Sequence, residues 1–178
     1  MREVRFHGRG GQGAVTAATL LAVAAGLDGK YSQAFPSFGT ERRGAPVKAF
    51  CRIDDRPITI RSQVYNPDYV VVMDSTMLEL PDIYSGAKES SLFVINSGKQ
   101  PELLEKVQTK VYDATGLALE VMGKPIVNTA MVGFFAAATG LVSMKSLKQS
   151  LESVFSGKVL ELNQKIIEEA EKRSGGKK

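Results

Sequence analysis

The sequence contains few residues that bind redox-active metals. Cys51 is the single cysteine and His7 is the single histidine among 178 residues. One thiol cannot form an intramolecular disulfide, and it cannot supply the four thiolates of an iron–sulfur or zinc site within one chain. We therefore expect this chain to hold no metal and no redox centre of its own.

Long apolar runs are also missing. No run approaches the ~18 apolar residues that a membrane helix needs, and the sequence opens on a strand-like segment without an apolar signal region. With 43% hydrophobic and 24% charged residues, the composition is ordinary for a soluble protein and sufficient for one globular domain over residues 1–178. We expect a cytoplasmic protein that does not contact membranes.

Basic residues are concentrated in one segment. The whole chain has a net charge of +4, and residues 42–62 alone carry an excess of that size. This segment contains two acidic residues and six basic ones, namely Arg42, Arg43, Lys48, Arg52, Arg56 and Arg61. A local cluster favours an anionic ligand or a partner surface over a protein that coats nucleic acid. We therefore expect no nucleic-acid partner.

The hydrophobic pattern predicts an α/β fold. Alternating or continuous apolar segments predict strands at 4–7, 31–35, 47–53, 69–73 and 91–95, with weaker candidates at 110–112 and 126–127. Residues 58–61 alternate after the Asp54-Asp55 turn, which predicts a hairpin with 47–53 and so a mixed sheet. Helical spacing predicts helices at 14–25, ending at Gly26, and near 100–107, 114–122, 129–139, 144–155 and 158–173. We expect a single three-layer α/β/α domain with a mainly parallel central sheet, a Rossmann-like first βα unit and a frayed tail at 173–178.

A glycine loop joins the first predicted strand to the first predicted helix. It contains Gly8, Gly10, Gly11, Gln12 and Gly13. In this context the glycines permit a tight turn, and the helix N-terminus offers unpaired N–H groups that suit a phosphate. A purely structural turn is the alternative. A nicotinamide cofactor is disfavoured, because its ribose needs an acidic residue about 20 positions downstream, whereas Gln33-Ala34-Phe35-Pro36 contains none.

An arginine loop follows the second predicted strand. In a doubly wound sheet Arg42 and Arg43 lie at the carboxyl edge beside the glycine loop. Guanidinium groups bind phosphates through charge-assisted, often bidentate hydrogen bonds. The arginines therefore bind a ligand, dock a partner subunit or remain solvated. Coenzyme A, with a pyrophosphate and a 3′-phosphate, matches one glycine loop plus one arginine pair.

Other polar residues have simpler explanations. We expect His7 to be packed or hydrogen-bonded at the end of its strand, and Cys51 to lie in the core. Asp74 and Asn96 close two predicted strands, where each caps a turn or contacts a ligand. We expect the stripe of Met131, Phe134 and Phe135 to form core or a subunit interface. No nucleophile and base have a spacing that indicates catalysis, so we expect no catalytic residue.

Two stretches together resemble a known family. Residues 7–13 (His-Gly-Arg-Gly-Gly-Gln-Gly) and 33–46 (Gln-Ala-Phe-Pro-Ser-Phe-Gly-Thr-Glu-Arg-Arg-Gly-Ala-Pro) look like the signatures of the gamma subunit of pyruvate and 2-oxoisovalerate ferredoxin oxidoreductases. The likeness continues through Arg52-Ile53, Asp74, Asn96-Ser97 and residues 128–131, and it covers most of the chain up to about residue 140.

The resemblance implies a role inside a multi-subunit enzyme. In this family the alpha, beta and delta subunits hold thiamine diphosphate, magnesium and 4Fe-4S clusters, and they pass electrons from the 2-oxoacid to ferredoxin. The gamma domain is associated with positioning coenzyme A, and it is not catalytic alone. A second hypothesis is an assembly module of the same complex that binds no ligand, and a third is a fragment of a dehydrogenase. Relatives acting on 2-oxoglutarate or indolepyruvate tend to have Arg-Gly-Gly where this chain has Arg43-Gly44-Ala45-Pro46, which favours pyruvate or a branched-chain 2-oxoacid.

Overall fold

A six-stranded sheet organises the chain. The computed structural model describes residues 1–37, 43–101 and 107–175, and the statements below concern these ranges. The strand order in the sheet is β2-β3-β1-β4-β5-β6. The strands are β1 (Arg2–Arg9), β2 (Tyr31–Pro36), β3 (Pro46–Asp54), β4 (Tyr69–Val72), β5 (Leu92–Asn96) and β6 (Gln108–Tyr112).

The sheet is mixed and mainly parallel, as predicted. β1 pairs in parallel with β4, β4 with β5, and β5 with β6. β3 runs in the opposite direction between β1 and β2 and is antiparallel to both. The carboxyl ends of β1, β4, β5 and β6 therefore meet at one edge of the sheet, where α/β folds bind their ligands.

The predicted hairpin between 47–53 and 58–61 is wrong. Both sides of β3 are already paired, by β1 and by β2, so no edge of β3 is left for residues 58–61. That segment instead runs as irregular chain. The guanidinium of Arg52 holds it by donating to the carbonyl oxygens of Ile60 at 3.4 Å and Gln63 at 3.1 Å. The weak strand prediction at 126–127 is also wrong, because Val127 is the residue that precedes α3.

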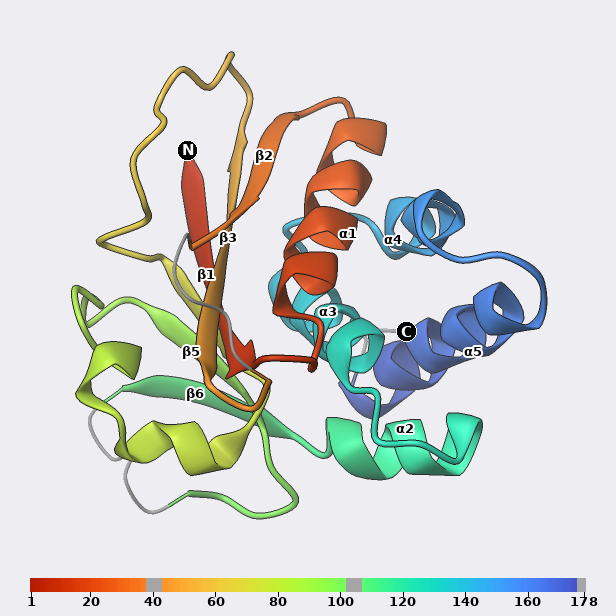
Figure 1. The fold of residues 1–178 in the computed structure, drawn as a ribbon. Coiled ribbons are helices and arrows are strands. Elements are labelled where there is room, and N and C mark those ends of the chain that lie inside the picture. The colour runs from red at the N-terminus through yellow and green to blue at the C-terminus, as the bar shows by residue number, and fades with distance from the viewer. Residues whose placement is uncertain (38–42, 102–106, 176–178) are drawn as a thin grey trace.

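Five α-helices cover one face of the sheet, and short 3-10 turns cover the other (Figure 1). The helices are α1 (Ala14–Leu27), α2 (Ala114–Met122), α3 (Asn128–Thr139), α4 (Met144–Ser150) and α5 (Gly157–Arg173). The turns are η1 (Ser75–Glu79) and η2 (Pro81–Ile83) on the opposite face, with η4 (Leu151–Ser153) continuing α4. The α/β class with helical elements on both faces is confirmed, but the second outer layer is thinner than predicted.

The predicted helix boundaries hold within a few residues. α1 continues one residue past Gly26, so this glycine does not end the helix. The helix predicted at 144–155 is shorter and ends in the η4 turn. The helix predicted near 100–107 falls largely on residues 102–106, outside the described residues, as does the tail at 176–178. No helix of the described ranges is long and apolar enough to cross a membrane.

The main core lies between the sheet and the α-helices. α1 contributes Ala17, Ala18 and Ala25, all fully buried, and such small side chains let a helix lie close to a sheet. Phe134 and Phe135 of α3 are buried in the same cluster, which confirms the predicted stripe as core. A smaller cluster on the opposite face joins alternate residues of β4 and β5 to η1 and η2. β4 and β5 are therefore buried on both faces, as their continuous apolar runs predict.

Candidate functional site

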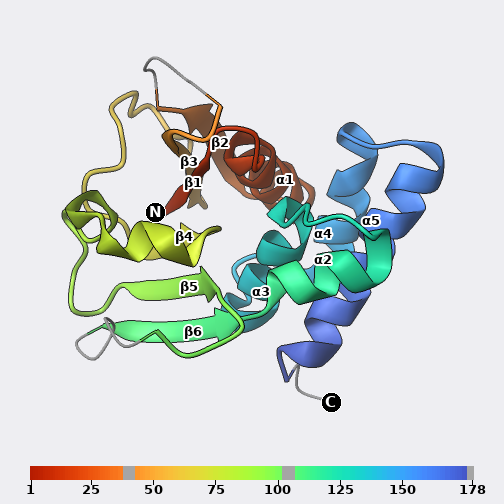
Figure 2. The same ribbon diagram turned by 60° about the horizontal axis from the view of Figure 1, so that its bottom comes forward.

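Four polar segments follow the carboxyl ends of the parallel strands. The glycine loop follows β1, Asp74 follows β4, Asn96 ends β5 and Asp113 follows β6. In Figure 2 β5 and β6 run side by side with their arrowheads toward the start of α2. Segments distant in sequence are thus gathered at one edge of the sheet.

The glycine loop has a backbone that only glycine adopts readily. Gly11 has φ +97° and Gly13 has φ +80°, both in the left-handed region that costs other residues about 1–2 kcal/mol. Gly13 is also in close contact with the start of α3, because a Cβ atom there would lie 2.6 Å from Nδ2 of Asn128. Glycine at this position therefore lets the two helices begin side by side without displacing the Asn128 side chain.

The N-terminus of α1 is available to an anion. Gly13 precedes the helix, no side chain caps its first turn, and the first turn contains no acidic residue. The first helical hydrogen bond runs from the N–H of Ala17 to the carbonyl of Gly13, so the preceding N–H groups have no partner within the helix. This is the arrangement in which helix N-termini bind phosphate.

Gln12 and Arg9 attach the glycine loop to β4 through Asp74. Oε1 of Gln12 accepts from the N–H of Arg9 at 2.7 Å, and Nε2 of Gln12 donates to Oδ2 of Asp74 at 3.2 Å. The guanidinium of Arg9 donates to the same carboxylate oxygen at 3.0 Å and to Oγ1 of Thr76 at 2.8 Å. Gln12 therefore holds the loop in shape, and its amide is already engaged in a network within the chain.

The network also determines the charge of Asp74. Partial burial acts to raise its pKa, but hydrogen bonds donated by Thr76, Arg9 and Gln12 outweigh burial and hold the pKa below its usual value. Asp74 also caps η1 by accepting from the N–H of Thr76 at 3.0 Å. Asp74 was predicted either to cap a turn or to contact a ligand, and its described contacts are those of a capping residue.

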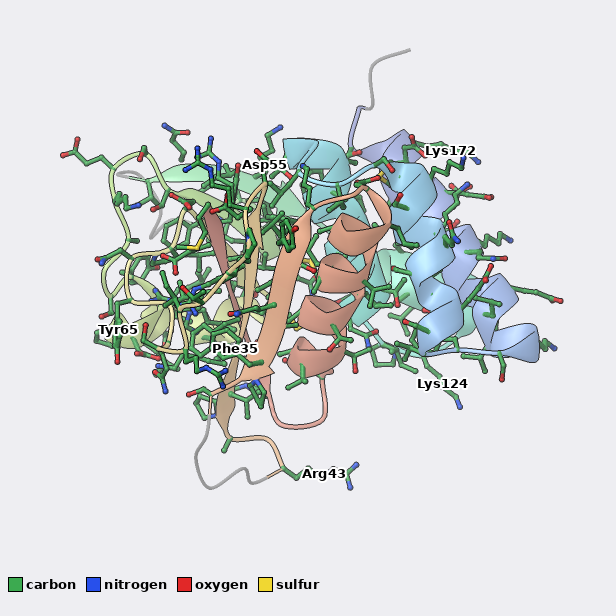
Figure 3. All side chains as sticks on the ribbon, turned by 90° about the horizontal axis from the view of Figure 1, so that it is seen from above. Phe35, Arg43, Asp55, Tyr65, Lys124 and Lys172 are labelled. Carbon is green, nitrogen blue, oxygen red and sulfur yellow. The ribbon has the colours of Figure 1, made fainter. Side chains whose placement is uncertain are left out.

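The arginine loop lies beside the glycine loop, as predicted. The N–H of Gly10 donates to the carbonyl of Ala45 at 2.8 Å, and the N–H of Gly44 donates to the carbonyl of Gly10 at 3.1 Å. Arg43 is exposed, and its side chain extends away from the sheet (Figure 3). Arg42 lies outside the described residues. The loop that carries Arg43 is therefore hydrogen-bonded to the glycine loop, and the Arg43 side chain itself is exposed.

A cleft of about 530 Å³ lies next to the glycine loop. Its polar lining comes from Gln12, Asp74, Ser75, Asn96, Ser97, Asp113 and Thr115. Two of these residues are carboxylates, and one of them, Asp74, is paired with the guanidinium of Arg9 at 3.0 Å. The described lining of the cleft therefore contains no cationic side chain, whereas the start of α1 has N–H groups without a partner in the helix.

Asn96 and Asp113 stabilise the walls of this cleft. Asn96 donates to the carbonyl of Met73 and to Oγ1 of Thr115, both at 2.9 Å, and accepts from the N–H of Thr115 at 3.2 Å. Asp113 caps α2 by accepting from the N–H of Gly116 at 2.7 Å. Asn96 joins β4, β5 and α2, which is a structural use of the amide.

The predictions for His7 and Cys51 are confirmed. His7 is 1% exposed and accepts a hydrogen bond at Nε2 from Nε of Arg5 at 2.9 Å. Cys51 is fully buried, and burial raises the pKa of its thiol. Among the described residues no three metal-ligating side chains gather in one place.

Sequence reasoning missed the role of Arg9. Its position inside a glycine motif gave no indication that it would pair with Asp74, 65 residues away. The one sequence signal for this contact was Asp74, a polar residue after the fourth predicted strand. Because the carboxyl ends of parallel strands meet at one edge of a sheet, Asp74 could be expected near the glycine loop. The pair shows that the shape of the glycine loop depends on β4 as well as on its own glycines.

Gly13→Ala is expected to lower the free energy of unfolding by roughly 2 kcal/mol, from the left-handed backbone and the contact with Asn128 together. Gly11→Ala is the matched control, because its φ is also positive but a Cβ there meets no atom within 4 Å. Denaturant unfolding of both variants is the measurement. Equal losses for the two would show that the contact with Asn128 costs nothing.

Comparison with known proteins agrees with this geometry. Residues 3–172 match the family described as pyruvate ferredoxin/flavodoxin oxidoreductase. The chain is 57% identical over 170 residues to "Pyruvate synthase subunit PorC" of Methanocaldococcus jannaschii, covering 96% of this chain and 95% of that one. It is 53% identical over 176 residues to "Pyruvate/ketoisovalerate oxidoreductases common subunit gamma" of Thermococcus kodakarensis, with the same coverage.

Solved structures have the same fold. Pyruvate oxidoreductase subunit PORC of Thermotoga maritima superimposes with a TM-score of 0.84 at 37% identity, over 96% of this chain and 95% of that one. A 2-oxoglutarate:ferredoxin oxidoreductase from Magnetococcus marinus superimposes with a TM-score of 0.81 at 18% identity, where this chain matches 31% of a longer one. The second likeness concerns the fold alone. From the family match and the full-length relatives together, the chain belongs to the pyruvate ferredoxin/flavodoxin oxidoreductase family and corresponds to its separate gamma subunits.

Proposed function

We infer that this chain is the gamma subunit of a 2-oxoacid:ferredoxin oxidoreductase complex and that it binds coenzyme A by its phosphates. The observation that carries this inference is the uncapped N-terminus of α1, which follows two left-handed glycines and lies beside the loop that carries Arg43. Backbone N–H groups and a guanidinium are donors that suit phosphate oxygens.

The acidic cleft next to the loop supports one orientation of the coenzyme. Asp113 disfavours phosphates in the cleft, where Asp74 is already paired with Arg9. The amides and hydroxyl of the pantetheine arm can instead hydrogen-bond to the carboxylates, Asn96 and Thr115. The nucleotide end then lies at α1 and Arg43, and the arm lies along the carboxyl edge of β4 and β5. The chain's own residues thus bind and orient the coenzyme, and they carry out no bond-breaking step.

The remaining chemistry is assigned to partner subunits. We place thiamine diphosphate, magnesium and 4Fe-4S clusters in the alpha, beta and delta subunits, with ferredoxin as the electron acceptor. The full-length relatives carry names that specify pyruvate or ketoisovalerate, which supports pyruvate or a branched-chain 2-oxoacid as the substrate. Coenzyme A bound to this chain would then receive the acyl group formed by its partners.

The test is the Arg43→Gln variant in the assembled complex. We expect the KM for coenzyme A to rise about 3- to 10-fold, because a charge-assisted hydrogen bond stabilises by roughly 1.5–3 kcal/mol and the exposed position of Arg43 reduces this. The KM for the 2-oxoacid should not change. Arg56→Gln, which removes an equally exposed charge outside the loop, is the control.

The same assay separates the assembly alternative. If Arg43 contacts the 3′-phosphate, the variant should lose discrimination between coenzyme A and dephospho-coenzyme A. A variant chain that folds but no longer joins its partners would show instead that Arg43 docks a subunit. An unchanged KM for coenzyme A in an intact complex would remove the ligand role from this residue.

A further inference from the structure

β2 forms one edge of the sheet, with half of its backbone directed outward. The N–H of Ser37 donates to the carbonyl of Lys48 at 2.9 Å, and the register continues without interruption to Tyr31 opposite Asp54. In an antiparallel pair hydrogen-bonded and non-hydrogen-bonded positions alternate. Phe35, Gln33 and Tyr31 are therefore bonded to β3, whereas the backbone groups of Ser32 and Ala34 point away from it.

The outward groups are suited to another strand. In the described part of the chain no hydrogen bond reaches the N–H of Ser32 or of Ala34. β2 (Tyr-Ser-Gln-Ala-Phe-Pro) also carries no charged side chain, whereas the opposite edge strand, β6, has Lys110 at its centre. Lysine on an edge strand discourages pairing with another chain. β2 therefore lacks a protective lysine, and Pro36 limits the edge that another strand could pair with to the residues before it.

A groove runs along the same strand on the face that α1 does not cover. It has a volume of about 580 Å³ and is lined by Gln33–Phe35 and by Ile58–Arg61. Nε2 of Gln33 donates to the carbonyl of Ile58 at 3.0 Å and fixes the distance between the two walls. In Figure 3 Phe35 lies on β2 on the side opposite α1. Phe35 and Ile60, which is 43% exposed, make the groove partly apolar.

The charge of the groove is positive. Arg61 is exposed and is the one charged residue among those that line it. Two other members of the basic cluster are used inside the chain, since Lys48 pairs with Asp82 and Arg52 pairs with Glu3. Arg61 lies on the segment Ile58–Arg61 that forms one wall of the groove, whereas the exposed Arg56 precedes this segment and does not line the groove.

We propose that the β2 edge and this groove dock an extended segment of another subunit of the oxidoreductase, one that alternates apolar and acidic side chains. Its backbone adds a strand to β2 at Ser32 and Ala34, and its side chains contact Phe35, Ile60 and Arg61. Strand addition is an established mode of recognition in which the backbone supplies affinity and alternate side chains supply specificity. A second copy of this chain fits poorly, because pairing two β2 edges would bring two copies of the positive groove together. The inference rests on the proposed membership of a multi-subunit complex.

The first measurement is residue-resolved hydrogen exchange of the free chain and of the assembled complex. We expect the N–H groups of Ser32 and Ala34 to exchange at least tenfold more slowly in the complex. Outward N–H groups of β6 should exchange at the same rate in both. Equal exchange of β2 in the two states would overturn the proposal, and so would protection in a homodimer of the free chain.

The second measurement is the affinity of the chain for the remaining subunits. Arg61→Glu is expected to weaken association at least tenfold, and Arg56→Glu is the matched control because it makes the same charge change outside the groove. Equal effects of the two variants would overturn the proposal. A wild-type chain that does not associate with the other subunits would overturn this inference together with the proposed function. A complex that assembles but shows no role of this chain in coenzyme A binding would remove only the coenzyme role.

Discussion

Arg52→Met is expected to lower the free energy of unfolding by about 2–3 kcal/mol. This is less than the ~3–5 kcal/mol lost when one partner of a fully buried ion pair is removed, because the Glu3 side chain is 20% exposed. Arg52 is 1% exposed, and its Nε donates to Oε1 of Glu3 on β1 at 2.8 Å. The same guanidinium holds residues 60 and 63 by their carbonyls and lies 5.2 Å from the ring centre of Phe35. Removing the guanidinium therefore leaves the Glu3 carboxylate without its partner and also removes the hydrogen bonds that hold residues 60 and 63. Denaturant unfolding followed by circular dichroism is the measurement.

Two further variants separate the contributions. Adding Glu3→Gln to Arg52→Met removes the carboxylate that has lost its partner and should recover roughly 1 kcal/mol. Arg61→Met replaces an exposed arginine on the same segment and should change stability by less than about 0.5 kcal/mol. A loss for Arg52→Met no larger than that for Arg61→Met would show that the buried guanidinium does not anchor the segment.

Local pattern predicted most of the sheet. β4 and β5 are continuous apolar runs, and such runs predict strands buried on both faces whatever their neighbours are. Residues 58–61 show where this reasoning fails, because their alternation is that of a strand but pairing requires a vacant edge. β3 has no vacant edge once β1 and β2 flank it. Strand order is a property of the whole fold, and the alternation of four residues carries no information about it.

The candidate site was predictable in its location and less so in its contacts. A glycine loop after the first strand and an arginine loop after the second were expected to meet, and the Gly10–Ala45 hydrogen bond confirms this. The partner of Arg9 was not predictable, because the contact with Asp74 depends on β4 lying next to β1. Gln12 similarly looked available to a ligand from its position alone, yet its amide bonds to Asp74.

Electrostatic roles within the basic cluster also needed the structure. Six basic residues over 21 positions indicate an anionic ligand or partner, but Arg52 belongs to β3 and points toward Glu3. Lys48, on the same strand, pairs with Asp82 of η2. The side chains on one face of a strand contact the elements that pack on that face, and those elements come from distant parts of the sequence. The cluster thus divides into internal anchors and an exposed remainder that includes Arg43, Arg56 and Arg61.

The second large effect is expected when the pH falls, and it comes from His7. Burial lowers the pKa of His7 from 6.5 to about 3, and the nearby Arg5 and Lys48 act in the same direction, whereas Asp82 opposes them. The hydrogen bond from Nε of Arg5 also requires a lone pair on Nε2 of the imidazole. The folded chain therefore keeps His7 neutral at pH values where the unfolded chain protonates it.

Well above pH 6.5 His7 is neutral in both states, so it contributes no dependence of stability on pH. As the pH falls below 6.5 only the unfolded state gains a proton, and stability decreases until about pH 3, where the folded state is protonated too. Between pH 7.5 and pH 4 this amounts to roughly 3 kcal/mol, since each pH unit contributes about 1.4 kcal/mol.

His7→Gln is the matched variant, because its amide oxygen can accept from Arg5 but does not titrate. Unfolding free energies of both proteins across this range should show the wild type losing roughly 3 kcal/mol more than the variant. Carboxylates other than Asp82, whose pKa depends in part on His7, titrate equally in the two proteins and cancel in the difference. Parallel curves would therefore show that His7 is not kept neutral by its burial.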